Sequence, residues 1–389
     1  MISLTEGKII QDPLYGPIRI EGIFLELVDT PEFQRLRNIK QLGLCYLVFP
    51  EANHTRFSHS LGTYFLLSQM ESIWRDKDLY YEKIAGLLHD IGHPPFSHTF
   101  EDIFKGISGK SHEDLGCDII TGSGESYSSR INAILEKHGV DTKKIAGLLK
   151  GTPTNSGEFI PSLISGPLDM DELDYLRRDA FFCGVPIGNI DFSRLLNTME
   201  FDGPNLYVKE KGLTALESLY INRFFMYRTV YFHRTVRIAS LMVRKSLEAV
   251  DDESMLKAVN MDDFHFVDLL LSRRETRDTW ESVQRRDIFK TVFRTPYTKK
   301  SMHSIETSLN HKGMKDGVLI DIIPPLSFSG SSGLKTTQLI QMGNELKVIS
   351  EVSEVVRSLS AVLDHRTICI SSRRDMEEAV MEALRESVS

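Results

Sequence analysis

Three separated stretches of the sequence place histidines and acidic residues close together. They read RFSH at 56–59, HDIGH at 89–93 and DMD at 169–171. Imidazole nitrogens and carboxylate oxygens form a mixed ligand set that suits a hydrolytic divalent metal and leaves coordination positions for water and phosphate oxygens. Together the three stretches predict a metal centre assembled from distant parts of the chain.

The pair His89-Asp90 has a simpler explanation when it is considered alone. His89 would be a hydrogen-bonded core histidine at the end of an apolar helix, and Asp90 would be a helix cap. The other two stretches favour the metal interpretation, because they supply further imidazole and carboxylate groups. Asp169 is assigned as a partner that orients the ligating groups, and not as a ligand.

A second group of polar residues follows directly. His98 and Glu101 are three residues apart, so the carboxylate can hold one imidazole nitrogen and fix the protonation of the other. His98 would then be a general acid for a departing alkoxide. His112 is expected nearby as a helix cap or a phosphate contact, and the alternative for this group is an ordinary polar loop.

Two further patterns suit a nucleotide. Asp171, Tyr175 and Asp179 fall on one side of a helix and offer a carboxylate to the metal, a ring to a nucleoside and a carboxylate to a sugar hydroxyl. A predicted helix over 212–245 carries two arginines and two tyrosines at helical spacing, namely Arg223, Tyr227, Tyr231 and Arg234. One guanidinium group can bind two phosphate oxygens at once. Arginines that cover an apolar core with their aliphatic stems give the same sequence pattern.

The elements that must position these residues are mostly helices. Thr30 is the expected cap of the first helix, with Pro31 as its first residue, and alternating apolar residues predict a short β-hairpin over 7–27. Further helices are predicted over 59–75, 80–92, 111–121, 127–138, 169–182, 212–245 and 263–285, and a closing helix over 375–387.

The last third of the chain has a different pattern. Strands are predicted over 318–323, 346–349 and 367–370, with a loop rich in Pro, Gly and Ser over 324–333. The predicted fold class is therefore mainly α. A helical core with an N-terminal β-hairpin covers residues 1–250, and a mixed α/β C-terminal lobe covers residues 251–389.

Composition narrows the class of protein. Hydrophobic residues make up 41% and charged residues 26% of the 389 residues, which is typical of a globular protein. The net charge of −8 argues against a nucleic-acid partner, which usually requires a basic surface. The four cysteines stand singly, which favours reduced buried thiols over a zinc site. Neither a signal peptide nor a membrane span is expected, so a cytoplasmic location is predicted.

The order H…HD…D is the signature of the HD-domain metal-dependent phosphohydrolases, and the chain resembles that family. The resemblance implies that the helical core is an HD domain. Over residues 8–290 it narrows to the deoxynucleoside triphosphate triphosphohydrolases, through the runs at 29–43, 48–50 and 53–62. The reaction of that family releases a deoxynucleoside and an intact tripolyphosphate.

The resemblance also implies roles for single residues. The metal ligands would be His59, His89, Asp90 and Asp171, holding magnesium, manganese, iron, nickel or zinc. The catalytic and phosphate-contacting set would be Asp90, His93, His98, Glu101 and His112. The triphosphate would be held by Arg56 and Arg223, and the deoxyribose by Gln41, Tyr175, Asp179 and Tyr231, with the two tyrosines excluding a 2′-hydroxyl.

The family further includes homo-oligomers, dimers or tetramers, that a nucleotide activates at a subunit interface. The matching positions are Lys8, Asp29, Gln34 and Arg37. Asp29 is equally suited to cap a helix, and Gln34 and Arg37 to lie on the surface. The expected partners are thus a nucleotide substrate, an activating nucleotide and further copies of the chain.

Two positions depart from the family pattern. Glu172 stands where relatives have a phosphate-contacting lysine, and Tyr227 replaces a histidine. A carboxylate facing a triphosphate would repel it, so the phosphate contacts differ or the substrate carries fewer phosphates. The leading hypothesis is hydrolysis of dNTPs, and the alternative is a phosphatase or phosphodiesterase acting on nucleoside monophosphates or a signalling nucleotide. A third class, a nucleotide- or nucleic-acid-binding protein without turnover, is disfavoured by the intact ligand set and the acidic balance.

Overall fold

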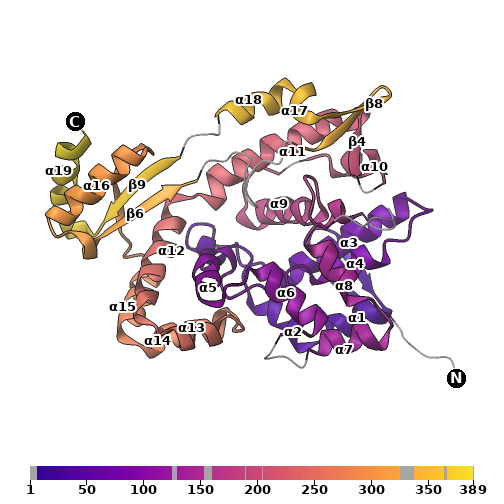
Figure 1. The fold of residues 1–389 in the computed structure, drawn as a ribbon, viewed down its shortest axis with the longest axis horizontal. Coiled ribbons are helices and arrows are strands. Elements are labelled where there is room, and N and C mark those ends of the chain that lie inside the picture. The colour runs from indigo at the N-terminus through magenta and orange to yellow at the C-terminus, as the bar shows by residue number, and fades with distance from the viewer. Residues whose placement is uncertain are drawn as a thin grey trace.

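The computed structural model describes residues 7–124, 129–152, 160–188, 190–203, 205–324, 337–362 and 366–388, and Figure 1 shows its helices and strands. The elements before residue 190 are β1 (Lys8–Asp12), β2 (Gly16–Ile20), α1 (Gly22–Val28), α2 (Pro31–Arg35), α3 (Arg56–Ile73), α4 (Tyr80–Leu88), α5 (Glu101–Ser108), α6 (His112–Thr121), α7 (Arg130–Lys137), α8 (Thr142–Leu149) and α9 (Met170–Cys183).

The elements after residue 190 are α10 (Phe192–Thr198), β3 (Met199–Asp202), β4 (Asn205–Lys209), α11 (Leu213–Met226), α12 (Arg234–Ser246), α13 (Asp252–Ala258), α14 (Asp263–Ser272), α15 (Arg274–Gln284), β5 (Lys290–Pro296), α16 (Lys299–His311), β6 (Val318–Ile323), β7 (Leu339–Met342), β8 (Glu345–Val348), α17 (Ile349–Val352), α18 (Glu354–Val362), β9 (Thr367–Ser372) and α19 (Glu377–Val388). Helices predominate, which confirms the predicted mainly α class.

Three helices form the frame that carries the histidines and aspartates. α3 packs against both α4 and α9. Their buried residues recur at helical spacing, as Leu173 and Leu176 do in α9. α9 begins at a cap, because the carboxylate of Asp169 accepts a hydrogen bond of 2.8 Å from the backbone N–H of Glu172. The cap fixes where the first turn of α9, and so Asp171, meets α3 and α4.

The predicted β-hairpin is present but shorter than expected. β1 and β2 pair antiparallel, with Asp12 opposite Gly16 at the turn. The prediction ran on to residue 27, whereas Gly22–Val28 form the helix α1. Its buried residues Ile23, Phe24, Leu27 and Val28 share one helical face, a spacing that an alternating strand pattern does not produce.

The predicted helix over 212–245 is interrupted. α11 continues into a π-helical turn over Tyr227–Tyr231, and α12 starts afresh at Arg234. The turn keeps both tyrosines with α11, whereas Arg234 is exposed on the next helix and does not join them, contrary to the prediction. The predicted helix over 263–285 likewise divides at Arg273 into α14 and α15.

The strands of the second half form two sheets. β6, β8 and β9 correspond to the three predicted strands, whereas β3, β4, β5 and β7 were not predicted. One contains β3, β4, β7 and β8 in that order, with β4 and β7 parallel. In the other, β9 lies between β5 and β6 and is antiparallel to both. Figure 1 places this second sheet with α16 and α19 at one end of the molecule, and α12 leads toward it.

Buried apolar residues form two clusters. The larger extends from Ile18 to Val283 and takes in Val356. The smaller joins α16, α19 and the second sheet through residues such as Ile305 and Ile370. The division at residue 250 stays a prediction, and the predicted loop over 324–333 lies, apart from its first residue, outside the described part of the chain. Of the helices described, none has the length and apolar character that crossing a membrane requires.

Candidate metal centre

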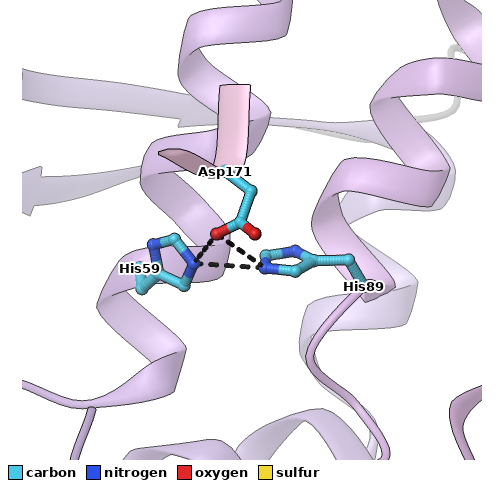
Figure 2. A group of neighbouring side chains, drawn as sticks. All are labelled: His59, His89 and Asp171. Atoms are coloured by element: carbon cyan, nitrogen blue, oxygen red, sulfur yellow. Dashed lines mark hydrogen bonds and ion pairs between the residues drawn. The ribbon is translucent and has the colours of Figure 1, made fainter. Parts of the chain in front are cut away.

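Side chains carried by three helices meet at one point, where Figure 2 shows His59, His89 and Asp171. His59 lies in the first turn of α3, His89 directly follows α4, and Asp171 lies in the first turn of α9. The Nε2 atom of His59 is 2.9 Å from Asp171 Oδ1 and 3.1 Å from His89 Nε2. His89 Nε2 is 3.6 Å from the same oxygen. Ligands about 2.1 Å from one ion lie about 3 to 3.5 Å apart, so the three atoms have the spacing of a metal site.

Hydrogen bonds on the far side of each ring aim a nitrogen lone pair into this point. Nδ1 of His59 lies 2.7 Å from Asp174 Oδ2, and Nδ1 of His89 lies 2.8 Å from the carbonyl oxygen of Gly86. Both oxygens are acceptors, so each Nδ1 carries the proton and each Nε2 can act as a ligand. When neither Nε2 carries a proton, two nitrogen lone pairs and a carboxylate oxygen face one another, and a cation between them would remove the repulsion among these three atoms.

The excess of negative charge around His59 also favours a bound cation. Burial lowers the pKa of the His59 imidazole, but the carboxylates of Asp171, Asp174 and Asp90 outweigh burial and raise it to about 10. The carboxylates that favour a proton on His59 equally favour a metal ion at its Nε2. The residues present therefore fit a divalent metal.

Asp90 lies beside the three converging atoms and holds an arginine. Its oxygens are 3.2 Å from His89 Nε2 and 3.8 Å from His59 Nε2, and Oδ2 accepts a hydrogen bond of 2.7 Å from Arg56. Burial raises the pKa of Asp90, but Arg56, His89 and His93 outweigh burial and hold it well below its usual range. Asp90 is thus an ionised group within reach of the cluster, and the assignment of four ligands stays a prediction.

The guanidinium of Arg56 is buried beside the cluster. Its Nε donates a hydrogen bond of 2.6 Å to Ser97 Oγ, its Nη1 pairs with Asp90, and its Nη2 has no partner among the described residues. Ser97 and Phe96 both adopt positive φ, at 53° and 56°, a conformation that L residues rarely adopt outside functional sites. A buried guanidinium N–H without a partner is a donor suited to a phosphate oxygen.

Three of the predicted catalytic residues lie together next to Asp90. The rings of His93 and His112 stack with centroids 3.8 Å apart, and His93 Nε2 is 3.3 Å from Asp90 Oδ1. The carboxylate of Glu101 contacts Nδ1 of His112. Burial, together with Arg56 and His112, holds the pKa of His93 well below its usual range. Glu101 was expected to orient His98, whose side chain lies outside the described residues, so that pairing stays a prediction.

The predicted sugar-binding residues form a hydrogen-bonded group. Asp179 accepts a hydrogen bond of 2.7 Å from the hydroxyl of Tyr231, and its other oxygen lies 2.7 Å from His54 Nε2. The ring of Tyr175 is centred 6.3 Å from that of Tyr231 and 6.5 Å from that of His59. These tyrosines therefore connect the metal-binding atoms to Asp179.

Gln41 completes this group through the backbone. Its N–H donates a hydrogen bond of 3.0 Å to the carbonyl oxygen of His54. The side chain is buried, and its Oε1 has no partner in the part of the chain that the structure describes. A buried amide oxygen without a partner can accept a hydrogen bond from a ligand.

Arg223 and Glu172 form a buried ion pair close to these tyrosines. Arg223 Nη1 donates to Glu172 Oε1, and the two side chains are 2% and 5% exposed. The guanidinium also lies 5.7 Å from the ring centre of Tyr227. The sequence assigned Arg223 to the triphosphate, but in the structure Glu172 already neutralises it.

The residues predicted to bind an activating nucleotide form two pairs. Lys8 Nζ is 2.9 Å from Asp29 Oδ2, and Arg37 Nε donates a hydrogen bond of 2.7 Å to Gln34 Oε1. The guanidinium of Arg37 also lies 3.6 Å from the ring centre of Phe57. Asp29 stands at the C-terminal end of α1, and activation by a nucleotide stays a prediction.

Sequence reasoning missed the buried groups that support the cluster. Asp169 was expected to orient the ligands, but it caps α9 and Asp174 contacts His59 instead. Asp174 could have been identified from the sequence, because it lies three residues after Asp171 on the same predicted helix. Arg178, which pairs with Asp174, follows one turn later. His54 gave no sequence signal, since its partner Asp179 lies far along the chain.

Both halves of the chain match described families. Residues 56–178 match the HD domain, and residues 190–389 match the HD associated region, which is over half of the chain. The chain belongs to the HD-domain phosphohydrolases. All three converging side chains of this phosphohydrolase lie within the HD domain match.

This HD-domain phosphohydrolase is similar to several known proteins. It is 29% identical over 75% of its length to a Dictyostelium discoideum protein named as a SAMHD1 homologue, a deoxynucleoside triphosphate triphosphohydrolase. A hypothetical protein from Aquifex aeolicus has the same fold, with a TM-score of 0.80 and 34% identity over 97% of this chain and all of that one. A phosphohydrolase from Bacteroides thetaiotaomicron gives 0.75 and 25% over 95% of this chain and all of that one. The chain spans 46–60% of the length of the curated relatives compared with it.

Proposed function

We propose that this chain hydrolyses deoxynucleoside triphosphates to a deoxynucleoside and tripolyphosphate. The observation that carries the proposal is buried Arg56, whose Nη2 has no partner in the part of the chain that the structure describes, beside the converging atoms of His59, His89 and Asp171. A phosphate donor and a metal-binding triangle in contact through Asp90 are what a phosphoester hydrolase needs. The name of the Dictyostelium relative supports the substrate class.

The metal would be held by His59, His89, Asp171 and Asp90. A bound divalent ion, whether magnesium, manganese, iron, nickel or zinc, supplies Lewis-acid chemistry at the phosphoryl group. The chain's own contribution is positioning. Asp90 orients Arg56 so that its Nη2 can donate to a phosphate oxygen, and Ser97 fixes the guanidinium plane.

Proton transfer to the departing 5′-oxygen is assigned to a histidine. We propose His98 as the general acid, as the family resemblance implies, with Glu101, His112 and His93 as further polar residues of the site. His93 is held neutral by its surroundings, which suits a group that accepts or relays a proton.

Selection of the sugar is assigned to Tyr175, Tyr231, Asp179 and Gln41. The hydrogen bond from the Tyr231 hydroxyl to Asp179 keeps the phenol ring from rotating away. A fixed ring next to Tyr175 leaves no space for an added 2′-hydroxyl, so deoxyribose is preferred over ribose.

Product analysis tests the proposal directly. Purified protein is incubated with each dNTP and NTP and with Mg²⁺ or Mn²⁺, and the products are separated by ion-exchange chromatography. Deoxynucleoside with tripolyphosphate is expected from dNTPs, and Asp171→Asn should abolish it. Asp171→Asn is a better control than a substitution of Asp90, because removing the Asp90 carboxylate would leave the buried Arg56 guanidinium without its carboxylate partner. Turnover that Asp171→Asn leaves unchanged would contradict the proposed centre.

Activation by a nucleotide and assembly into an oligomer are proposed from the family resemblance. A nucleotide bound near Lys8, Asp29, Gln34 and Arg37 would activate a dimer or tetramer of the chain. Parallel reactions with and without GTP, with light scattering to measure mass, test this part. Equal rates and an unchanged monomer mass would remove it without affecting the hydrolase proposal.

One observation favours a second candidate function. Because Glu172 pairs with Arg223, this guanidinium offers less positive charge to a substrate than the family resemblance implies. A nucleoside monophosphate or a signalling nucleotide needs fewer cations than a triphosphate does. Turnover of these compounds in the same panel, with none of any dNTP, would establish this phosphatase or phosphodiesterase instead.

A further inference from the structure

A continuous line of buried charges joins the N-terminal hairpin to the metal centre. Asp12 Oδ2, at the end of β1, accepts a hydrogen bond of 2.8 Å from Arg178 Nη1. Arg178 then donates through Nε and Nη2 to both oxygens of Asp174, at 2.8 and 3.0 Å. Asp174 Oδ2 lies 2.7 Å from Nδ1 of His59. Three hydrogen-bonded steps therefore separate the hairpin from a converging nitrogen.

Each member of this line is inaccessible to water. The side chains of His59, Asp174 and Arg178 are 0% exposed, and that of Asp12 is 4% exposed. A buried guanidinium requires carboxylate partners, and Arg178 has one on each side. Without Asp12, water would not replace the missing charge, and Arg178 would be left with Asp174 as its one carboxylate partner among the described residues.

Asp12 is itself held in place by the hairpin turn. Its Oδ1 accepts hydrogen bonds from the N–H groups of Leu14 at 2.8 Å and Tyr15 at 3.1 Å. The ring of Tyr15 stacks on Phe65 of α3, with centroids 4.7 Å apart. One carboxylate thus closes the turn with one oxygen and holds Arg178 with the other, while the turn is clamped to the helix that carries His59.

We infer that Asp12 and Arg178 are positioning residues of the metal centre. Asp12 fixes Arg178, Arg178 orients Asp174, and Asp174 keeps the proton of His59 on Nδ1 so that Nε2 faces the metal. The hairpin lies before residue 56, where the HD domain match begins, so this chain completes its metal centre with an element outside that domain. The inference rests on the proposed metal centre.

Metal affinity, and not activity alone, tests the inference. The metal is removed by chelation and Mn²⁺ is titrated into the full chain by calorimetry. Partners that orient a metal-bound histidine typically contribute tenfold to a hundredfold in affinity, and Asp12 acts on His59 through Arg178 and Asp174. We therefore expect Asp12→Ser to weaken Mn²⁺ binding by about tenfold.

The choice of variants separates positioning from folding. Serine at 12 can still accept from the N–H groups of Leu14 and Tyr15, so it keeps the turn while removing the charge. Arg19→Ala removes the exposed pair with Glu21 on the same hairpin and serves as the matched control. Arg178→Lys keeps a cation but loses the two-pronged contact with Asp174, and it should weaken Mn²⁺ binding as well.

The outcomes test the inference separately from the proposed metal centre on which it rests. If Asp171→Asn lowers Mn²⁺ affinity while Asp12→Ser, folded by circular dichroism, binds as tightly as Arg19→Ala, the hairpin is only structural and the inference is wrong. If Asp12→Ser does not fold, Arg178→Lys decides between the same two results. If the unaltered chain binds no Mn²⁺, or Asp171→Asn binds as well as it does, the metal centre itself is wrong.

Discussion

The role of each side chain at the site depends on the neighbouring group that holds it in place. His59 lies at the start of a helix and His89 at the end of one, and both present Nε2 because an oxygen holds Nδ1. Arg56 and Arg223 are both buried arginines and each pairs with a carboxylate. Asp90, the partner of Arg56, also lies 3.2 Å from His89 Nε2, so a bound metal would share that carboxylate. Arg223 has Glu172 as its partner, and this pair leads to a prediction about substrate charge.

Glu172→Gln should improve the binding of triphosphates. Removing the carboxylate leaves the Arg223 guanidinium available to phosphate oxygens, so KM for a dNTP should fall by about tenfold, as expected for one charge-assisted hydrogen bond of about 1.5 kcal/mol. Steady-state kinetics would measure this. The double variant Glu172→Gln with Arg223→Gln is the control and should lose the gain. An unchanged or higher KM in the single variant would show that Arg223 does not meet the substrate.

Asp263 should make stability depend on pH. Burial raises the pKa of its carboxyl to about 6, although the N–H groups of Lys40 and Phe96 donate to it at 3.0 and 2.6 Å. Between its ordinary pKa of 3.8 and about 6, the folded chain retains a proton that the unfolded chain has lost. Stability therefore falls as pH rises through this window, by about 3 kcal/mol in total, and is level above it.

Denaturant unfolding of the unaltered chain and Asp263→Asn at pH 4, 5, 6 and 7 would measure the effect. The difference in free energy of unfolding should shrink by about 2 kcal/mol from pH 4 to pH 7, because part of the total is already lost at pH 4. Asp268→Asn, which removes an exposed carboxylate from the same helix α14, is the control and should retain the slope. Parallel curves for the unaltered chain and Asp263→Asn would show that this carboxyl is already ionised at pH 4.

At the scale of elements, the close approach of α3 and α9 determines the site. Gly62 lies in α3 where α9 passes, and a Cβ there would lie 1.9 Å from Asp174 Oδ1 and 2.5 Å from Arg178 Nη2. Helix propensity favours alanine over glycine by about 1 kcal/mol. The glycine is therefore required by the neighbouring ion pair and not by its own backbone.

Gly62→Ala should destabilise the chain by about 2 kcal/mol or more and also weaken Mn²⁺ binding, because the Asp174–Arg178 pair must move away from His59. Gly147→Ala in α8 is the matched control, since nothing lies within 4 Å of its Cβ position. That substitution should leave stability unchanged or raise it slightly. Thermal unfolding and calorimetric titration measure both effects, and equal behaviour of the two variants would contradict the packing argument.

For the molecule as a whole, a metal ion would join segments that are far apart in sequence. His59, His89 and Asp171 come from three helices of the larger core. An ion that binds the folded chain alone stabilises it by mass action, by about 2.7 kcal/mol when its concentration is a hundred times Kd. The free energy of unfolding of the whole chain should therefore rise when an ion binds at this site.

Chelation should lower the unfolding temperature of the chain, and added Mn²⁺ should restore it. Scanning calorimetry with and without EDTA measures the shift, and Asp171→Asn should show little or none. A shift of the same size in Asp171→Asn would place the stabilising ion elsewhere in the molecule.

The sequence by itself determined the local features of this protein. The sequence predicted α3, α4 and α9, the Thr30-Pro31 start of α2 and the strands β6, β8 and β9, because periodic burial and capping are read from neighbouring residues, but it did not predict β5 or β7. The types of residue at 59, 89, 90 and 171 predicted metal chemistry in the same way. The π-helical turn after Met226, which separates Tyr231 from Arg234, had no such local signal.

The tertiary structure alone decided which polar groups meet. Asp12 contacts Arg178 across 166 residues, Glu101 contacts His112 across a turn, and Glu172 neutralises Arg223 from a different helix. Such pairs depend on the relative placement of elements, which composition and spacing do not contain. Burial then fixes the choice, because a charge removed from water must find its partner within the fold.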